Sequence, residues 1–405
     1  MNQTMRSLDQ ALDQILSAAR PVLEVEQIDT LDCVGRVLAA PICSAIDVPP
    51  RDNSMMDGYA VSRLDVMASG AKLKVAQRIA AGSIGHALER GTAARIFTGA
   101  PVPAGVDAVV MQELCEAEAD HVIVNHVPRD GEWIARRGSD IRGGAEVLAA
   151  GARLRPQDAG LAASVGAATV AVFRRLRVAL FSTGSELVMP GEELPPGAIY
   201  NSNRFLLRGL LESLGCAVTD FGIVRDDLGD TRTVLREAAK GNDLIVTSGG
   251  VSVGDEDHLK PAVQAEGELD LWKIALKPGK PLAYGRVRNA ADGASFVGLP
   301  GNPVSAFVTF VIVVRPLILK LQGAAHQEPV SDLRRADFDL PNPDARREFL
   351  RARLNASGGL ELFPNQSSAV LTSTAWADGL VDNPPGNRIR HGDQVRFLPF
   401  VGLLY

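Results

Sequence analysis

Hydrophobic residues recur at helical spacing near the start of the chain. Leucine and isoleucine return every three to four residues between positions 8 and 16, and Pro21 follows. This period is typical of an amphipathic helix. Ser7 and Gln10 match a capping box, in which two side chains satisfy backbone N–H groups of the first turn. The sequence therefore predicts a helix that begins after Ser7 and ends before Pro21.

From about residue 46 the pattern changes to short apolar and β-branched runs between glycines and prolines. Such runs are typical of strands joined by tight turns. They occur at residues 75–79, 93–97, 107–112 and 121–127. We expect a small β-rich module over 46–140, inserted into an elongated N-terminal linker domain made of 1–45 plus 141–173.

Strands and helices alternate from Val178 onward. Apolar runs at 178–181, 218–224 and 243–247 are separated by amphipathic stretches at 202–214 and 230–240. This alternation predicts a central doubly wound α/β domain with a parallel sheet over 174–324. Ligands of such sheets bind at the carboxyl ends of the strands.

A long apolar helix is expected over 304–321, with Pro316 kinking or breaking it. The apolar stretch 304–314 is shorter than the roughly 20 residues of a membrane span, so no membrane segment is predicted. After residue 324 the composition turns polar, and short strands are expected at 346–354, 360–363 and 394–400. These strands predict a small C-terminal β-barrel-like domain over 325–405.

Composition narrows the classes of function. The 405 residues carry a net charge of -6, which argues against a general binder of nucleic acid or anionic membranes. The four cysteines are scattered without a C-x-x-C pair, as in proteins of a reducing compartment. The first residues lack a secretory signal, so we expect a cytoplasmic protein. Its six histidines form no H-E-x-x-H pattern, and zinc-hydrolase chemistry is not indicated.

The segment from Asp243 to Asp257 joins an apolar run, a glycine-rich loop and three acids. Backbone N–H groups of such a loop can face an anion because glycine has no Cβ. Carboxylates beyond the loop can hold Mg²⁺ against that anion. The alternative is a tight strand-to-helix turn followed by a solvated acidic helix start.

Three consecutive strands each deliver a carboxylate to one rim, the third being the strand before the glycine-rich loop. Glu186 follows the first predicted strand of the α/β domain within Ser-Thr-Gly-Ser-Glu, and Asp226 follows the second within Arg-Asp-Asp. Because the carboxyl ends of parallel strands meet at one edge, these acids should lie near the glycine loop.

Further polar motifs are open to structural or functional interpretation. Lys277-Pro-Gly-Lys-Pro281 presents two lysines that suit a tetrahedral oxyanion, or forms a solvated turn. Gly298-Leu-Pro-Gly-Asn-Pro303 opens a helix whose N–H groups can face an anion. In the β module, residues 52–59 and 136–140 contain acids and an arginine pair. Residues 52–59 contribute to a site or form only an Asx-turn. The arginine pair in 136–140 is either an anion clamp or part of a surface ion pair.

In order, these motifs resemble the molybdopterin molybdenumtransferase family, the MoeA proteins and gephyrin E domains. The matching runs lie between about 45 and 305, and they are Asp52-Asn-Ser-Met-Met-Asp-Gly-Tyr-Ala, Thr98-Gly-Ala-Pro-Val-Pro, Phe181-Ser-Thr-Gly-Ser-Glu, Ser248-Gly-Gly-Val-Ser-Val-Gly, Lys277-Pro-Gly-Lys-Pro and Gly298-Leu-Pro-Gly-Asn-Pro. The resemblance implies an elongated homodimer of four-domain subunits. It also implies an active site between the α/β domain of one subunit and the β module of the other.

The reaction implied by the resemblance is insertion of molybdate into adenylylated molybdopterin, with Mg²⁺-dependent release of AMP and formation of molybdenum cofactor. The adenylyltransferase and molybdoenzyme chaperones are further implied partners. The expected catalytic acids are Asp57, Asp140, Glu186, Asp226 and Asp257, of which Asp226 and Asp257 would hold Mg²⁺. Expected substrate contacts are Thr98, Ser182, Gly249, Gly250, Gly254, Lys273, Lys277, Lys280, Pro281, Pro300, Asn302 and Pro303, with Arg351 and Ser368 added from the C-terminal domain.

The chain departs from the family pattern at two positions. Ala135 stands where an arginine is expected, and His258 where a tyrosine is common. Two other functions compete with the resemblance. One is a molybdopterin adenylyltransferase, which shares the α/β domain but lacks the module that carries Asp57 and Asp140. The other is a non-enzymatic cofactor-binding or scaffold protein.

Overall fold

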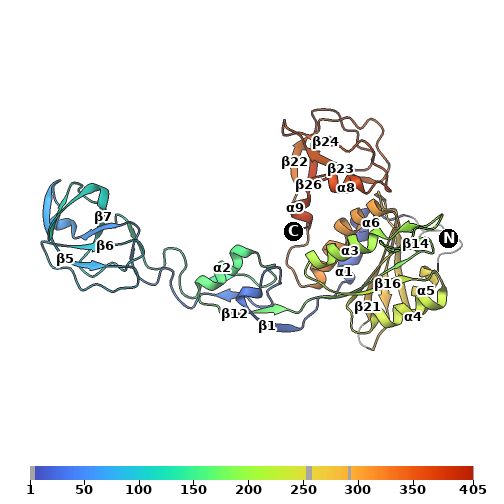
Figure 1. Cartoon of the computed structure of the whole chain (residues 1–405), viewed down its shortest axis with the longest axis horizontal. Coiled ribbons are helices and arrows are strands. Elements are labelled where there is room, and N and C mark those ends of the chain that lie inside the picture. Colours follow the sequence, from blue (N-terminus) through green and yellow to red (C-terminus); the bar gives the residue numbers. More distant parts are fainter. Residues whose placement is uncertain (1–4, 252–257, 291–292, 405) are drawn as a thin grey trace.

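The chain is elongated, with its β module at one end and its α/β and C-terminal domains at the other (Figure 1). The structure is a computed structural model that describes residues 5–251, 258–290 and 293–404, without the side chains of 271 and 272. A slender linker domain lies between the two ends. The predicted multidomain α/β class is confirmed.

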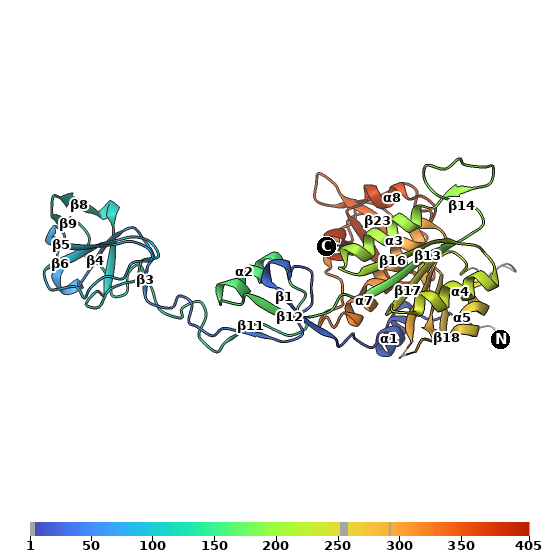
Figure 2. The same ribbon diagram turned by 60° about the horizontal axis from the view of Figure 1, so that its bottom comes forward.

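The first helix, α1 (Leu8–Ala18), has the expected capping box. The Gln10 N–H donates to Ser7 Oγ at 3.2 Å, and the Ser7 N–H donates to Gln10 Oε1 at 3.1 Å. Residues 1–45 are expected in the linker domain, but Leu8 and Ile15 of α1 belong to the hydrophobic core of the α/β domain. Figure 2 shows α1 at that end of the molecule. The apolar stripe of the helix predicts that one face is buried, but it does not indicate against which domain that face packs.

The linker domain has a small core of its own between two short sheets and a helix. Two segments, 19–24 and 174–176, join it to the α/β domain. Its elements are β1 (Val25–Asp29) paired with β12 (Thr169–Phe173), β2 (Ile42–Cys43) paired with β11 (Glu146–Leu148), the 3₁₀ turn η1 (Thr30–Asp32) and α2 (Pro156–Ser164).

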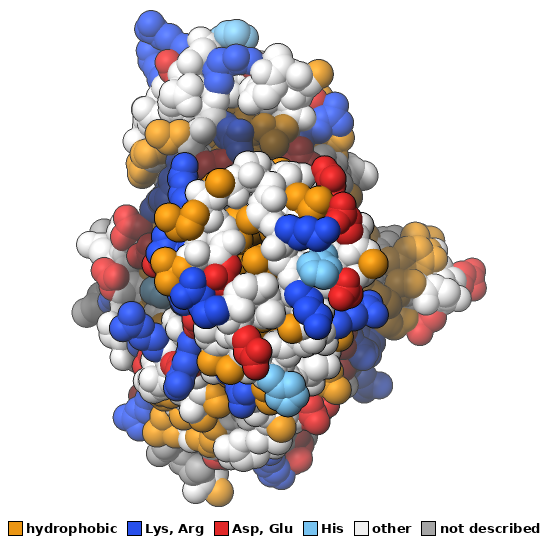
Figure 3. Space-filling view, turned by 90° about the vertical axis from the view of Figure 1, so that its left-hand side faces the viewer, with side chains coloured by type: hydrophobic (Ala, Val, Ile, Leu, Met, Phe, Trp, Pro, Cys, Tyr) orange, Lys and Arg blue, Asp and Glu red, His pale blue; other side chains and the backbone are white. Residues whose placement is uncertain are grey.

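The β module is a six-stranded sheet with an apolar cluster on each face. Its strand order is β7-β4-β6-β5-β9-β8. On the face of the molecule drawn in Figure 3, acidic and basic side chains are interspersed. Ion pairs of the module include Arg90–Asp65 and Lys72–Glu118. The elements are β3 (Asn53–Ser54), β4 (Gly58–Val61), η2 (Arg63–Asp65), β5 (Ala71–Ile79), β6 (Thr92–Ile96), β7 (Ala108–Met111), η3 (Gln112–Leu114), β8 (Cys115–Glu118), β9 (His121–Val124) and β10 (Ile134–Ala135).

The sheet of the α/β domain is mixed rather than wholly parallel. Its order is β16-β13-β17-β21-β20-β18, in which the first four strands are parallel and β20 runs antiparallel to both of its neighbours, β21 and β18. Helices α1, α3, α6 and α7 share the core on one face, and α4 and α5 share the core on the other. The bounds are β13 (Arg177–Thr183), β14 (Leu187–Val188), β15 (Ile199–Tyr200), α3 (Ser202–Ser213), β16 (Ala217–Val224), α4 (Leu228–Ala239), β17 (Leu244–Ser248), α5 (Leu259–Glu266), β18 (Gly267–Lys273), β20 (Pro281–Val287) and β21 (Ala294–Leu299).

The apolar helix from Pro303 to Leu321 is continuous and buried. It comprises α6 (Pro303–Thr309), a π-helical segment η4 (Phe310–Val314) and α7 (Arg315–Leu321). Pro316 lacks an N–H and crowds the preceding turn of an α-helix, and the hydrogen bonds widen to the π pattern just before it. Length and hydropathy alone would let this helix cross a membrane, but 94% of the 18-residue window is buried inside the protein. It is a core helix.

The C-terminal domain is joined to the α/β domain by a strand and by shared core. Strand β19 (Leu276–Lys277) leads into the lysine loop, residues 277–281, and pairs in parallel with β23 (Arg347–Leu354). The rings of Phe307 and Phe400 pack edge to face at 5.3 Å. The other elements are β22 (Asp332–Arg335), β24 (Leu360–Leu362), α8 (Thr372–Trp376), β25 (Gly379–Asn383), β26 (Gln394–Pro399) and α9 (Phe400–Leu404).

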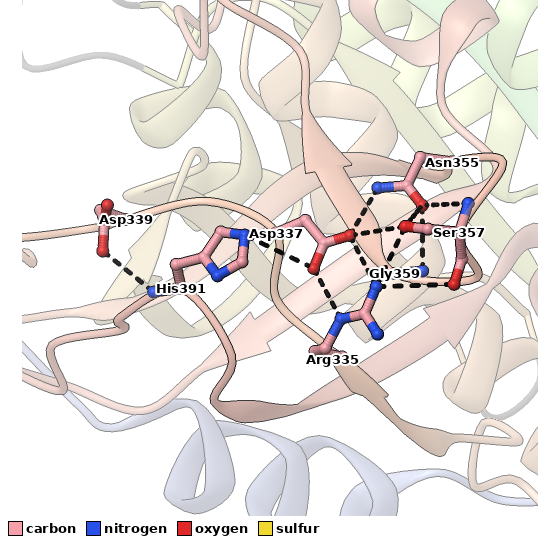
Figure 4. Close-up of polar contacts among 7 residues, drawn as sticks. All are labelled: Arg335, Asp337, Asp339, Asn355, Ser357, Gly359 and His391. Carbon is pink, nitrogen blue, oxygen red and sulfur yellow. Dashed lines mark hydrogen bonds and ion pairs between the residues drawn. The ribbon is translucent and has the colours of Figure 1, made fainter.

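A carboxylate holds one end of this C-terminal sheet together (Figure 4). Asp337 accepts hydrogen bonds from Arg335 Nε at 2.7 Å, Asn355 Nδ2 at 2.7 Å and Ser357 Oγ at 3.1 Å. Asn355 Oδ1 in turn accepts from the N–H of Gly359 at 3.0 Å. The Arg335 guanidinium, followed by Asn355 and Ser357, holds the pKa of Asp337 well below its usual range.

Asp337→Asn is therefore expected to lower the free energy of unfolding at neutral pH. The depressed pKa of the folded state means that the carboxylate stabilises the fold above its unfolded pKa of about 3.9. This contribution is lost as pH falls through the folded value. The stability difference between wild type and Asp337→Asn should thus be constant at neutral pH and shrink below about pH 4, as measured by urea unfolding at several pH values. A difference that grows on acidification would contradict it.

Candidate active site

A cleft of about 730 Å³ opens at the carboxyl ends of the parallel strands. Strands β13, β17 and β21 all end at it, as the crossover topology of the sheet predicts. The lining residues that the sequence analysis singled out are Glu186, Asp226, Gly249, Gly250, Pro281, Pro300, Asn302 and Pro303.

Two glycines let the loop after β17 pass close to β13. Gly249 and Gly250 have φ of +92° and +63°, a region that side-chain-bearing residues rarely adopt. A Cβ on Gly249 would lie 2.2 Å from the carbonyl oxygen of Thr183. The loop therefore requires glycine here, and its backbone is left accessible from the cleft. Gly254 and Asp257 lie outside the described residues.

Buried polar atoms without partners gather beside this loop. Each belongs to a residue with under a tenth of its surface exposed, and each lacks a hydrogen bond within the described part of the chain: Ser182 Oγ, Thr183 Oγ1, Asn201 Nδ2, Asn203 Oδ1 and Thr247 Oγ1. An unsatisfied buried polar group costs about 1–3 kcal/mol. Thr183, Asn201 and Asn203 line the cleft itself. This concentration of donors and acceptors indicates a binding site for a polar ligand.

Two adjacent aspartates after β16 have different positions. Asp227 caps α4, since its Oδ1 accepts from the N–H groups of Gly229 at 2.8 Å and Asp230 at 3.1 Å. The N–H of Asp230, followed by that of Gly229, lowers the pKa of Asp227. Asp226 lines the cleft, as does Glu186. The structure thus brings two of the predicted acids into one cavity.

The lysine loop lies where the α/β and C-terminal domains meet. Lys277 Nζ is 3.0 Å from Glu348 and 3.3 Å from Asp344. Although burial opposes it, these two carboxylates raise the pKa of Lys277. Lys280 is exposed, and no ion pair to it occurs within the described ranges. Pro281 pairs with Lys273 across the β20–β18 ladder and lines the cleft.

The C-terminal domain contributes a loop to the cleft. The carbonyl oxygen of Ser368 accepts from the Val304 N–H at 3.0 Å, and Ala369 and Leu371 line the cavity. Ser368 thus acts through its backbone at the start of α6.

Arg351 lies beneath the loop rather than in the cavity. It is 1% exposed, and its guanidinium donates to Ser373 Oγ at 3.2 Å and to the carbonyl oxygens of Phe349 and Ser367 at 3.3 and 3.4 Å. Burial lowers the pKa of Arg351 to about 10. In this structure it holds the loop in position.

The remaining predicted residues lie on the β module or beside it. Asp57 Oδ1 accepts from both the N–H and the Oγ1 of Thr98, each at 2.8 Å. The Thr98 N–H, followed by its hydroxyl, lowers the pKa of Asp57. Asp140 lies where the module joins the linker domain, with its N–H donating to Val48. Within one chain the β module lies at the opposite end of the molecule from the α/β domain (Figures 1 and 2).

Sequence reasoning missed several residues of the cleft. Asn203 Nδ2 donates to Ser248 Oγ and to the Gly301 carbonyl oxygen, both at 2.7 Å, and so joins α3 to two loops. Leu187, Ile199 and Tyr200 form an apolar wall on the β14–β15 ribbon. The available signal was the Asn-Ser-Asn run at 201–203, at the start of a helix that follows a strand end.

Three family models match successive parts of the chain. The MoeA N-terminal region (domain I and II) matches residues 6–166, a probable molybdopterin binding domain matches 179–320, and the MoeA C-terminal region (domain IV) matches 334–400.

Full-length proteins are similar as well. The molybdopterin molybdenumtransferase of Haemophilus influenzae is 40% identical over 99% of this chain and 100% of its own. That of a Nostoc species is 36% identical over 90% of this chain and 86% of its own. A crystal structure of the molybdopterin biosynthesis MoeA protein from Pyrococcus horikoshii is 32% identical and has a TM-score of 0.78, with 98% of this chain and 99% of that chain covered.

Proposed function

Because the chain belongs to the molybdopterin molybdenumtransferase family, the MoeA proteins, we propose that it inserts molybdate into adenylylated molybdopterin and releases AMP. It is a transferase of molybdenum cofactor biosynthesis. The observation that carries the proposal is the cleft. There a glycine loop, Asp226 and Glu186 lie together with buried polar atoms that have no hydrogen-bond partner among the described residues. A phosphate-bearing heterocycle supplies the donors and acceptors that these atoms lack.

The phosphate end of the substrate fits the glycine loop. Gly249 and Gly250 expose backbone without a Cβ, and the hydroxyl of Thr183 lies beside them. The heterocycle would lie against the wall of Leu187, Ile199 and Tyr200, because flat rings pack favourably on apolar and aromatic side chains. Asn203, whose Oδ1 has no hydrogen bond from the residues that the structure describes, would accept a hydrogen bond from the bound substrate.

The donor set is compatible with Mg²⁺. No group of three or more His, Cys, Asp or Glu side chains occurs in the described part of the chain, so a closed all-protein metal site is not present there. Mg²⁺ commonly uses one or two carboxylates, water and substrate phosphates, and Asp226 in the cleft suits that arrangement. Asp257 would be the second carboxylate. When bound, the ion supplies positive charge to the phosphoanhydride oxygens.

Molybdate would bind at the lysine loop beside Pro281. Lys280 is exposed there. Lys277 already forms ion pairs with the carboxylates of Glu348 and Asp344. A tetrahedral dianion would compete with these acids for Lys277, whereas Lys280 has no such competitor within the described residues. Lys280 is therefore the more direct oxyanion contact.

We also propose that the functional unit is a homodimer. Asp57 belongs to the β module and Asp140 to its junction with the linker domain, and the linker domain separates this module from the α/β domain (Figure 1). Their carboxylates would therefore meet the cleft of a second subunit rather than that of their own chain. The proposed setting is the cytoplasm, in line with four free cysteines.

The test is to incubate the protein with adenylylated molybdopterin, molybdate and Mg²⁺, and to measure AMP and molybdenum cofactor. Release of both products in equal amounts is the expected result. Formation of adenylylated molybdopterin from molybdopterin and ATP would instead indicate an adenylyltransferase. Binding without turnover would indicate a scaffold.

Lys280→Ala is expected to raise the molybdate concentration at half-maximal rate by about tenfold, since a charge-assisted contact contributes roughly 1.5 kcal/mol. The maximal rate should change little, because oxyanion binding can be restored by more molybdate. Lys240→Ala is the matched control, since Lys240 is an exposed lysine of the same domain that pairs with Glu237 on α4. An unchanged molybdate requirement in Lys280→Ala would remove Lys280 from the site.

A further inference from the structure

Two arginines of the β module lie over the same aromatic ring. The guanidinium carbon of Arg78 on β5 is 4.8 Å from the centroid of the Phe97 ring, and that of Arg95 on β6 is 4.7 Å from it. Arg95 also lies 5.2 Å from the centroid of the Tyr59 ring. Cation–π contacts of this kind hold a guanidinium group in place while it keeps its charge. Because β5 and β6 pair in parallel with Arg78 opposite Arg95, the sheet holds two positive charges side by side.

This pair of arginines adjoins an acid that the family resemblance assigns to the active site. Phe97 directly precedes Thr98, whose N–H and hydroxyl donate to Asp57. These two hydrogen bonds lower the pKa of Asp57, and the charge of Arg95 adds to their effect. The arginines and the acid therefore belong to one surface of the module.

The two arginines differ in how they are held. Arg95 donates to two neutral acceptors, the carbonyl oxygen of Gly58 at 2.8 Å and Oε1 of Gln112 at 2.5 Å. Arg78 is exposed, and its guanidinium donates no hydrogen bond to any residue that the structure describes. Arg95 is thus fixed by the module, whereas Arg78 keeps its N–H groups for another acceptor.

The cleft of the α/β domain is short of positive charge. Its lining includes the carboxylates of Glu186 and Asp226, but no lysine or arginine among the described residues. Residues 252–257, which continue the glycine loop outside the described ranges, contain three acids and no lysine or arginine. Carboxylates repel the phosphate groups of an adenylylated substrate unless cations are also present. A bound Mg²⁺ would supply part of that charge, and the lysine loop is assigned to molybdate.

We propose that Arg78, with Arg95 beside it, binds the phosphate groups of the substrate in the cleft of the partner subunit. The inference rests on the proposed function, in which the β module of one subunit reaches the cleft of the other. Arginine suits this role because its planar group donates to two phosphate oxygens at once. The module thereby adds the positive charge that the cleft lacks.

Arg78→Ala is expected to raise the Michaelis constant for adenylylated molybdopterin by about tenfold. The maximal rate of AMP release should change little, because the contact is made in the ground state as well as in the transition state. The molybdate requirement should stay at its wild-type value, which separates this contact from the lysine loop. Arg78→Lys keeps the charge and should restore part of the affinity. Arg90→Ala is the matched control, because Arg90 is an exposed arginine of the same module that pairs with Asp65 at 2.9 Å.

The outcomes separate this inference from the proposed function. If the wild type releases AMP and Arg78→Ala has the same Michaelis constant, the inference alone fails. An equal rise in Arg90→Ala would show a general charge effect and would overturn it as well. If the wild type releases no AMP from the substrate, the proposed function fails and the inference falls with it.

Mixing Arg78→Ala with Glu186→Ala tests whether the contact crosses between subunits. In a mixed dimer, the intact module of the Glu186→Ala subunit meets the intact cleft of the Arg78→Ala subunit. Half of the Arg78→Ala subunits enter mixed dimers on random reassociation of equal amounts. At substrate concentrations below both Michaelis constants, activity per Arg78→Ala subunit should therefore rise about fivefold over that variant alone. No rise, although mixed dimers form, would place the contact within one subunit and overturn the proposal.

Discussion

Asp57→Ala and Glu186→Ala, each inactive alone, are expected to regain activity when their subunits are mixed. Asp57 lies on the β module and Glu186 in the cleft at the other end of the chain. If each active site combines the module of one subunit with the cleft of the other, a mixed dimer has one intact site. Random reassociation should restore about a quarter of wild-type activity, because half of the dimers are mixed and each has one site of two.

The control for this experiment is a mixture of two variants from the same end. Glu186→Ala and Asp226→Ala both remove a carboxylate of one cleft, so no mixed dimer contains an intact site. Cofactor formation is measured after the subunits exchange under mild denaturation and are returned to native conditions. Restored activity in the same-end mixture, or none in the opposite-end mixture although mixed dimers form, would contradict a site shared between subunits.

Asp226→Ala is expected to lower the rate of AMP release by about a thousandfold. The carboxylate lines the cleft beside the glycine loop, where it would hold Mg²⁺ against the phosphoanhydride. Loss of several kcal/mol of stabilisation in the transition state corresponds to a factor of about a thousand, since 1.4 kcal/mol is tenfold. Single-turnover release of AMP, followed across a range of Mg²⁺ concentrations, measures the effect.

The neighbouring carboxylate provides the control. Asp227 caps α4 with two hydrogen bonds to backbone N–H groups, so Asp227→Ala should lower the stability of the fold by loss of the helix cap. It should leave the rate of AMP release near that of wild type. If both variants lose activity to the same extent, the local fold rather than the metal contact is responsible, and the role given to Asp226 is wrong.

Much of the fold could be predicted from local pattern. The capping box of α1 and the apolar runs of β13, β16 and β17 predict these elements with bounds that lie within a few residues of those observed. The sequence analysis predicts no strand at β18 or β20, and the alternation of strands and helices does not indicate that β20 runs antiparallel to both of its neighbours. The π-helical segment before Pro316 was also missed, because local sequence shows the missing N–H but not how the helix adapts.

The sequence predicts those residues of the site that directly follow the predicted parallel strands. Glu186 and Asp226 were found because parallel strands direct their carboxyl ends to one edge. Asn203 was missed because a polar residue at a helix start resembles a capping group. The place of Arg351 among the expected substrate contacts rests on the family resemblance alone. Its burial and its three hydrogen bonds depend on distant residues that no local pattern shows.

Strand β19 makes the C-terminal domain inseparable from the rest of the enzyme. Lys277 pairs with Glu348 along the backbone and through its side chain, and Phe307 packs on Phe400. A chain cut after residue 324 would leave an open sheet edge and uncovered apolar surface, both of which favour aggregation. Transplanting the α/β domain into another protein would therefore require its border to be rebuilt, with new polar residues where Phe400 now packs.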